Sequence, residues 1–171
     1  MKNCLIVIDM QNDFISGSLG SEEAKKIVPY VKERIEKAIK DGEDIYFTKD
    51  THYDDYLDKK EGQFLPVKHC VEGTIGHAIC DELKPYEKNA KEIFTKNTFG
   101  CKDLPNFLSD YDTLTFLGLC TDICVVSNVI LTKAFYPEKN IVVEKDGCAG
   151  TSVDNHIAAL KVMGSCHIVI K

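Results

Sequence analysis

Short apolar runs and segments with helical spacing alternate along the whole chain. Runs with the length of buried strands predict strands at residues 5–8, 45–48, 92–95, 114–117, 141–143 and 167–170. Ser21 is expected to cap a first long helix, and residues 41–42 end it. Pro29 is expected to restart that helix, because proline fits a first helical turn. The buried face of this helix is predicted to contain Val28, Val31, Ile35, Ala38 and Ile39.

The remaining helices are predicted from smaller apolar groups. Ile79 and Leu83 indicate a short helix that Pro85 stops, and residues 104–108 indicate another. Residues 51–75 have no such periodicity and are predicted to form a long loop. Another helix is predicted after Thr121, with the apolar residues Val126, Val129, Ile130 and Ala134. A last helix is predicted after the 141–143 run, with the apolar residues Ile157, Ala158, Leu160 and Val162.

Repeated strand–helix alternation predicts the fold class. It indicates an α/β protein, a three-layer α/β/α sandwich around a mainly parallel, Rossmann-like sheet of about six strands. A chain of 171 residues is expected to form a single domain, residues 1–171. Right-handed crossovers would place an active site at the carboxyl ends of the strands. The glycine-rich phosphate loops are absent, so nucleotide binding has no direct support.

Charge and composition narrow the range of partners. The net charge of −6 argues against nucleic acid or an anionic membrane as a partner. The apolar runs are too short for a transmembrane helix, and the run at residues 4–8 is too short for a signal peptide. We therefore expect a cytoplasmic protein. In that compartment the eight cysteines are expected to be free thiols rather than disulfides.

Four polar features follow successive predicted strands at their carboxyl ends. They are Asp9, Asp50 with His52, Lys96 and Cys124. Each residue alone has an ordinary structural explanation, as a turn residue, a solvent-facing charge or a packed thiol. If the sheet is parallel, however, all of them meet at one edge. Their convergence favours a catalytic site.

An acid, a lysine and a cysteine together fit hydrolysis by a nucleophilic thiol. Cys124 lies at a strand-to-helix junction, where unpaired backbone N–H groups and the helix dipole favour a thiolate. Asp9 would take the thiol proton and later deliver it to a leaving amine, and Lys96 would supply a fixed positive charge. Backbone N–H groups of Cys120 and Cys124 would bind the oxyanion.

Histidine and carboxylate side chains also gather around the second strand end. Asp50, His52 and His69, with Glu61 between the histidines, offer ligands that suit Zn²⁺, Fe²⁺ or Mn²⁺. A polar loop with incidental histidines fits the same spacing, and the spacing alone leaves both readings open. No ligand pattern includes the other histidines, which are predicted to be structural or on the surface: His77, His156 and His167.

Several motifs in this order resemble the isochorismatase-like cysteine hydrolases, and most closely the nicotinamidases. The resemblance extends from residue 4 to about residue 170. It rests on Asp9-Met10-Gln11-Asn12-Asp13-Phe14, Asp50-Thr51-His52, His69-Cys70-Val71-Glu72-Gly73-Thr74, Lys96 and Gly118-Leu119-Cys120-Thr121-Asp122-Ile123-Cys124-Val125.

The resemblance implies a complete active site. It implies a triad of Asp9, Lys96 and Cys124, and a divalent metal, with Zn²⁺ first and Fe²⁺ or Mn²⁺ as alternatives. The metal would be held by Asp50, His52 and His69, with Glu61 as the additional acidic ligand of some members. It also implies a cis peptide between Leu119 and Cys120, and stacking of Phe14 on the substrate ring. The implied reaction converts nicotinamide and water to nicotinate and ammonia through a thioester, as in NAD salvage.

The sequence also departs from the nicotinamidase pattern. Thr51 stands where these enzymes typically have tryptophan, and the chain contains no tryptophan at all. Phe64 or Leu65 occupies the region of a second family tryptophan, so both are candidate substrate contacts. Residues 54–56 replace a typical histidine-serine-phenylalanine stretch. The resemblance, with these departures, therefore implies a small carboxamide as substrate, with nicotinamide the first candidate.

Two other interpretations and one question of assembly stay open. The same triad would serve an isochorismatase-type hydrolase or a hydrolase of another small amide, such as a carbamoyl compound. A non-catalytic protein that binds a small molecule or stores metal is the remaining alternative. Family members often assemble, and a homo-oligomer would use apolar surface residues such as Phe135 and Tyr136.

Overall fold

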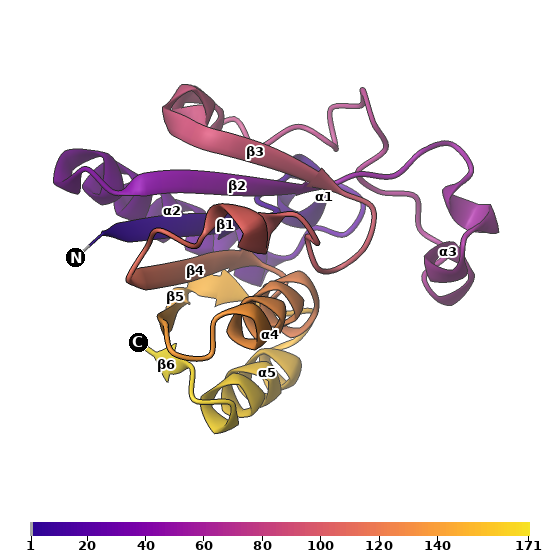
Figure 1. Cartoon of the computed structure of the whole chain (residues 1–171). Coiled ribbons are helices and arrows are strands. Elements are labelled where there is room, and N and C mark those ends of the chain that lie inside the picture. Colours follow the sequence, from indigo (N-terminus) through magenta and orange to yellow (C-terminus); the bar gives the residue numbers. More distant parts are fainter. Residues whose placement is uncertain (1) are drawn as a thin grey trace.

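The computed structural model describes residues 2–171, and its centre is a six-stranded parallel sheet (Figure 1). The strands lie in the order β3-β2-β1-β4-β5-β6, and every neighbouring pair is parallel. Their bounds are β1 (Asn3–Ile8), β2 (Asp44–Asp50), β3 (Ala90–Lys96), β4 (Thr113–Leu119), β5 (Asn140–Ala149) and β6 (Val169–Ile170). All six predicted strands are present, with β5 longer and β6 shorter than predicted.

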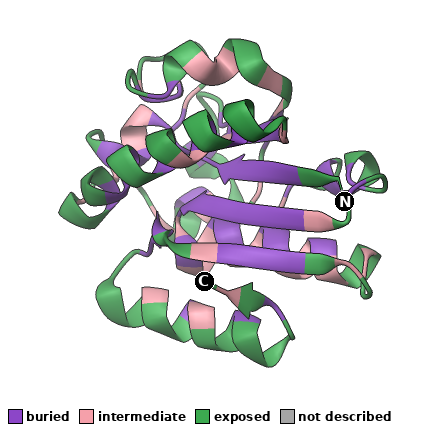
Figure 2. Cartoon of the chain, turned by 90° about the vertical axis from the view of Figure 1, so that its left-hand side faces the viewer, coloured by how far each residue is buried: buried purple, intermediate pink, exposed green. Residues whose placement is uncertain are grey.

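Helices cover both faces of this sheet. In Figure 1, α2 (Glu22–Asp41) lies behind the sheet, and α4 (Val126–Phe135) and α5 (Val153–Ser165) lie in front. The central strands β1, β2 and β4 are almost wholly buried, whereas the outer sides of the helices are exposed (Figure 2). The predicted three-layer α/β architecture is therefore confirmed. Within residues 2–171, no helix is both long and apolar enough to cross a membrane.

The first long helix is continuous through Pro29, contrary to the predicted restart. Ser21 caps α2 as predicted, because its side chain accepts the Ala24 N–H at 3.0 Å. Proline removes one backbone donor, whose partner would be the carbonyl of the exposed Lys25. The apolar face continues on both sides of Pro29, from Ala24 to Ala38, and its burial keeps the helix in one piece.

The helix predicted around Ile79 and Leu83 does not form. Both side chains are fully buried, but the backbone of this segment pairs with residues 10–12 instead. Ile79 forms an antiparallel bridge with Gln11, and the Cys80 N–H donates to the Met10 carbonyl at 3.0 Å. Pro85 lies in the first turn of the 3₁₀ helix η2 (Lys84–Asn89) rather than ending a helix, because an N–H has no helical partner in a first turn.

Three other segments differ in detail from the prediction. The predicted 104–108 helix is a 3₁₀ turn, η3 (Leu104–Phe107). The 51–75 loop contains an arm, residues 53–68, with η1 (Tyr56–Asp58) and α3 (Lys60–Phe64), which projects at the right of Figure 1. In α5 the buried residues are Ala159 and Met163, whereas two residues of its predicted apolar face are more than half exposed, Ile157 and Val162.

The order of strands determines where a ligand can bind. From β1 the chain moves outward to β2 and β3, and then returns to β4 on the other side of β1. In open parallel sheets, such a reversal leaves a crevice beyond the carboxyl ends of the two central strands. Here those strands are β1 and β4, so Asp9 and the segment after Leu119 lie on either side of the crevice.

Candidate active site

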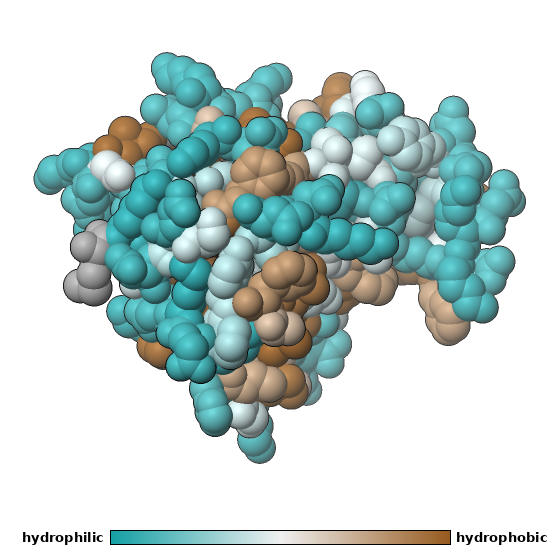
Figure 3. All heavy atoms as spheres, viewed as in Figure 1, coloured by the Kyte–Doolittle hydropathy of each residue, from teal (hydrophilic) through white to brown (hydrophobic). Residues whose placement is uncertain are grey.

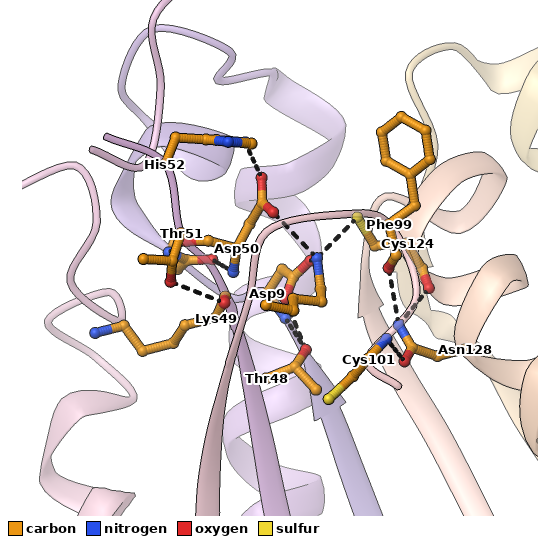
Figure 4. A network of polar contacts seen from close by, with 12 residues as sticks. Asp9, Thr48, Lys49, Asp50, Thr51, His52, Phe99, Cys101, Cys124 and Asn128 are labelled. Carbon is orange, nitrogen blue, oxygen red and sulfur yellow. Dashed lines mark hydrogen bonds and ion pairs between the residues drawn. The ribbon is translucent and has the colours of Figure 1, made fainter. Parts of the chain in front are cut away.

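Lys96 contacts the other two residues predicted to form the triad, Asp9 and Cys124, both of which are labelled in Figure 4. Its Nζ lies 2.7 Å from Asp9 Oδ2 and 3.4 Å from Cys124 Sγ. Asp9 directly follows β1, Lys96 ends β3, and Cys124 lies in the π turn η4 (Thr121–Val125) that follows β4. All three are buried, with Asp9 fully buried and Cys124 5% exposed. The three predicted residues therefore lie in contact at the predicted sheet edge.

Burial and mutual charge set the protonation of this group. Burial would lower the pKa of Lys96, but the charges of Asp9, Cys124 and Asp50 raise it well above its usual value. Burial raises the pKa of Asp9, while Lys96 opposes that shift. Burial and then Asp9 also raise the pKa of the Cys124 thiol. These directions oppose the predicted low-pKa thiolate, and Cys124 needs a base to lose its proton.

Asp9 is placed to be that base. Its Oδ1 accepts a hydrogen bond from Thr48 Oγ1 at 2.6 Å, which fixes the carboxylate. Its Oδ2 pairs with Lys96 but has no aligned hydrogen bond within residues 2–171. A carboxylate oxygen has more than one lone pair, so Asp9 can pair with Lys96 and also accept the Cys124 proton.

The four predicted metal ligands converge beside the triad. One ligand atom from each of Asp50, His52, Glu61 and His69 lies within 4.8 Å of the other three. Asp50 Oδ2 is 2.9 Å from His52 Nε2 and 3.4 Å from His69 Nε2, and Glu61 Oε1 is 3.7 and 3.8 Å from the same nitrogens. Two imidazoles and two carboxylates in this arrangement form a candidate site for a divalent metal.

Neighbouring groups fix the orientation and charge of these ligands. The Nδ1–H of His69 donates to the Val67 carbonyl at 2.8 Å, which leaves Nε2 with the lone pair that a metal needs. Burial raises the pKa of Asp50, but hydrogen bonds with His52 and His69 and the charge of Lys96 outweigh burial. The net result is a pKa well below the usual value of an aspartate. Asp50 therefore presents a carboxylate. Its other oxygen, Oδ1, lies 3.3 Å from Lys96 Nζ and connects the metal site with the triad.

Two residues that hold the candidate metal ligands in place were not predicted from the sequence. Gln11 is fully buried and clamps the Asp50 backbone, accepting the Asp50 N–H at 2.7 Å and donating to the Asp50 carbonyl at 2.8 Å. Tyr56 packs its ring against the rings of both histidines, with centroids 4.6 Å from His52 and 5.0 Å from His69. Gln11 lies within a motif quoted above, but its partners are 39 residues away, so only the fold reveals its role.

A cleft of about 1640 Å³ is lined by Cys124 and by the four candidate metal ligands. Figure 3 shows the surface hollowed between the arm and the body of the molecule. Phe14 lines the cleft next to His69, with ring centroids 5.6 Å apart. Phe64 and Leu65 also line it from the arm, although Phe64 is 81% exposed. Phe99, which the sequence analysis did not single out, lines it from the loop after Lys96.

The expected oxyanion donors belong to the same cleft. Cys120 and Cys124 both line it, and the Leu119–Cys120 peptide is cis, as the resemblance implied. Burial raises the pKa of Cys120 to about 12, so its side chain stays a neutral thiol. The binding of an oxyanion by the two backbone N–H groups stays a prediction.

Comparison with known proteins now identifies the family. A family model described as the isochorismatase domain matches residues 3–171. The chain belongs to the isochorismatase family. This confirms the predicted superfamily, and with it the prediction that the chain is an enzyme of a hydrolase family. No curated protein matches the chain.

Solved structures of isochorismatase-like proteins match the chain over nearly its whole length. A nicotinamidase from Bacillus subtilis is 29% identical, with a TM-score of 0.86 and 99% of each chain covered. A pyrazinamidase from Pyrococcus horikoshii in complex with zinc is 26% identical, with a TM-score of 0.83, covering 100% of this chain and 99% of that one. An N-carbamoylsarcosine amidase from Thermoplasma acidophilum is 28% identical, with a TM-score of 0.82, covering 100% and 96%. The nicotinamidase and the pyrazinamidase fit the predicted nicotinamidase branch, whereas the N-carbamoylsarcosine amidase fits the alternative of a carbamoyl compound.

Proposed function

We propose that this chain is a metal-assisted cysteine amidohydrolase that converts nicotinamide and water to nicotinate and ammonia. The observation that carries the proposal is the position of Lys96 Nζ, within 3.4 Å of both the Cys124 sulfur and the Asp9 carboxylate. The nicotinamidase from Bacillus subtilis, which is 29% identical, supports the choice of substrate.

The proposed reaction has two halves. Asp9 takes the Cys124 proton as the sulfur attacks the carboxamide carbon, and Lys96 stabilises the negative charge that develops at the sulfur and the acid. The C–N bond then breaks, the proton on Asp9 passes to the nitrogen, and ammonia leaves a thioester on Cys124. In the second half, Asp9 takes a proton from water as the water oxygen attacks the thioester carbon. The C–S bond then breaks, the proton on Asp9 returns to the sulfur, and nicotinic acid leaves and loses its proton to solvent as nicotinate.

The four-residue ligand cluster fits Zn²⁺, and Fe²⁺ or Mn²⁺ would suit the same donors. Asp50, His52, Glu61 and His69 would hold the ion. When bound, it would supply a Lewis acid to a ring nitrogen of the substrate or to a water. The zinc complex of the Pyrococcus horikoshii pyrazinamidase supports this assignment. Phe14 and Phe99 would contact the substrate ring from the walls of the cleft.

A carbamoyl amide is the second candidate substrate. Two observations favour it: the chain has no tryptophan to stack on a pyridine, and a structural neighbour is an N-carbamoylsarcosine amidase. The same triad would cleave either amide. The two candidates therefore differ in the contacts of the cleft and not in the chemistry of Cys124.

A side-by-side assay of the zinc-loaded protein tests the proposal. Ammonia release is measured on nicotinamide, pyrazinamide and N-carbamoylsarcosine, for the wild type and Cys124→Ala. We expect turnover of nicotinamide that Cys124→Ala abolishes while circular dichroism stays unchanged. Cys166→Ala, at the exposed cysteine, is the control and should keep full activity. Turnover of N-carbamoylsarcosine alone would select the second substrate, and turnover by Cys124→Ala would remove covalent catalysis.

A further inference from the structure

Asn128 connects the proposed nucleophile to the loop after Lys96. It lies in α4, one turn beyond Cys124, and is 1% exposed. Its Oδ1 accepts the Cys101 N–H at 2.8 Å. Its Nδ2 donates to the Phe99 carbonyl at 3.1 Å and to the Cys124 carbonyl at 2.8 Å. Figure 4 shows the three hydrogen bonds from the Asn128 side chain to Phe99, Cys101 and Cys124.

Each end of this link belongs to the active site. Cys124 lies in the π turn, where the regular i→i−4 bonding of an α-helix is interrupted. The Asn128 side chain adds a hydrogen bond to the nucleophile's own carbonyl within this turn. At the other end, residues 97–101 carry Phe99 into the cleft directly after Lys96. A buried amide with all its polar groups engaged fixes its partners more strictly than apolar packing would.

We infer that Asn128 is a positioning residue that holds the loop 97–101 and the Cys124 turn in one fixed relative arrangement. The expected changes in kcat and KM rest on the proposed function, whereas the expected change in the position of Cys124 does not. Asn128 touches neither the sulfur nor the cleft, so it acts through Cys124 and Phe99. Its loss should displace both the attacking atom and a wall of the substrate cleft.

Three substitutions separate the contributions of the individual bonds. Asn128→Ala removes all three, and Asn128→Asp keeps the acceptor for Cys101 but has no N–H for the two carbonyls. Asn128→Thr returns a donor to the Cys124 carbonyl, since a helical threonine can bond the carbonyl four residues earlier, but it does not reach the loop. Thr132→Ala is the matched control, because Thr132 is buried one turn further along α4 and its hydroxyl has no partner within residues 2–171.

Two measurements read out these variants in a Cys166→Ser background, which removes the exposed thiol. One is kcat and KM for nicotinamide. The other is the rate at which iodoacetamide alkylates Cys124, followed by peptide mass spectrometry. For Asn128→Ala and Asn128→Asp we expect kcat to fall about ten-fold, the rate equivalent of one lost buried hydrogen bond. Alkylation of Cys124 should also slow about five-fold or more, because the sulfur is no longer held toward the cleft.

Rescue distinguishes positioning from stability. Asn128→Thr should recover the alkylation rate of Cys124, but its KM for nicotinamide should be raised, as in Asn128→Ala, because the loop 97–101 is no longer held. Thr132→Ala should change neither kcat, KM nor the alkylation rate, and the melting temperatures of all variants are measured so that losses of stability can be separated from losses of positioning. Wild-type kcat, KM and alkylation rate in folded Asn128→Ala would overturn the inference, as would equal losses in Thr132→Ala. If the wild type does not turn over nicotinamide, the proposed function fails, and the alkylation rates alone still decide the role of Asn128.

Discussion

Lys96 contacts both the proposed nucleophile and the candidate metal site. Its ammonium has three N–H donors, and it faces Asp9, Asp50 and Cys124, each from a different segment. Asp50 in turn uses one oxygen for Lys96 and the other for the two histidines. Charge at the metal site and charge at the sulfur are therefore linked through Asp50 and Lys96.

Glu61 is the one candidate ligand on the arm, and its substitution tests the ligand set. In Glu61→Gln a neutral amide replaces the carboxylate, so zinc affinity should fall by at least about ten-fold, measured by competition with a chromogenic chelator on metal-free protein. Glu72→Gln, at an exposed glutamate that also lines the cleft, should bind zinc like the wild type. Equal affinities in Glu61→Gln and the wild type would remove Glu61 from the site.

The residues that sequence could identify are those whose position depends on a local pattern. Asp9 and Lys96 stand directly at the ends of apolar runs, and a parallel sheet brings such ends together. Thr48, Gln11 and Asn128 could not be found this way. Their partners are 39, 39 and 27 residues away, and hydrogen bonds at such separations leave no periodic trace in the sequence.

At the scale of elements, the passage from β4 to the π turn requires a glycine. Gly118 has φ of +122°, and a Cβ there would lie 2.1 Å from the Ile8 carbonyl oxygen. This close approach lets β4 pair with β1 up to the point where the crevice opens. The sequence showed the glycine and the apolar run, but not the π turn, because a five-residue π turn and a first α-helical turn share the same pattern of apolar residues.

Gly118→Ala should therefore destabilise the protein strongly. We expect its free energy of unfolding in urea, followed by circular dichroism, to fall by at least about 2 kcal/mol, since both the steric overlap and the positive φ are unfavourable. Gly164→Ala is the control, because a Cβ at this position in α5 meets nothing within 4 Å. It should leave stability unchanged or raise it by up to about 1 kcal/mol. Equal stabilities of the two variants would contradict this account of β4.

The elements that the sequence misplaced have a common physical cause. The spacing of Ile79 and Leu83 predicts a helix. In the structure, both side chains are buried because the backbone near Ile79 pairs with the segment after β1. Such pairing joins segments almost 70 residues apart. Periodicity reports which residues are buried, and it cannot report which backbone supplies the hydrogen bonds.

At the scale of the whole molecule, the fold follows from strand–helix alternation. Two parts depart from the prediction: the β6 edge of the sheet with α5, and the arm. β6 has only two residues, so the sheet provides little surface under α5. The helix packs against η4 and α4 as well as the sheet, and Ile157 and Val162 stay exposed. The arm projects at the right of Figure 1. It brings Glu61 to Asp50 at the end of β2, His52 just after it, and His69.

The central claim is that Cys124 forms a covalent bond with the acyl group of a small amide. The most direct measurement is rapid acid quenching of zinc-loaded protein during nicotinamide turnover, followed by peptide mass spectrometry. The account predicts a nicotinoyl group on the Cys124 peptide and none on the Cys166 peptide, and no turnover after Cys124 has been fully alkylated. Undiminished turnover by the alkylated protein, with no acyl group on Cys124 in any quenched sample, would contradict it.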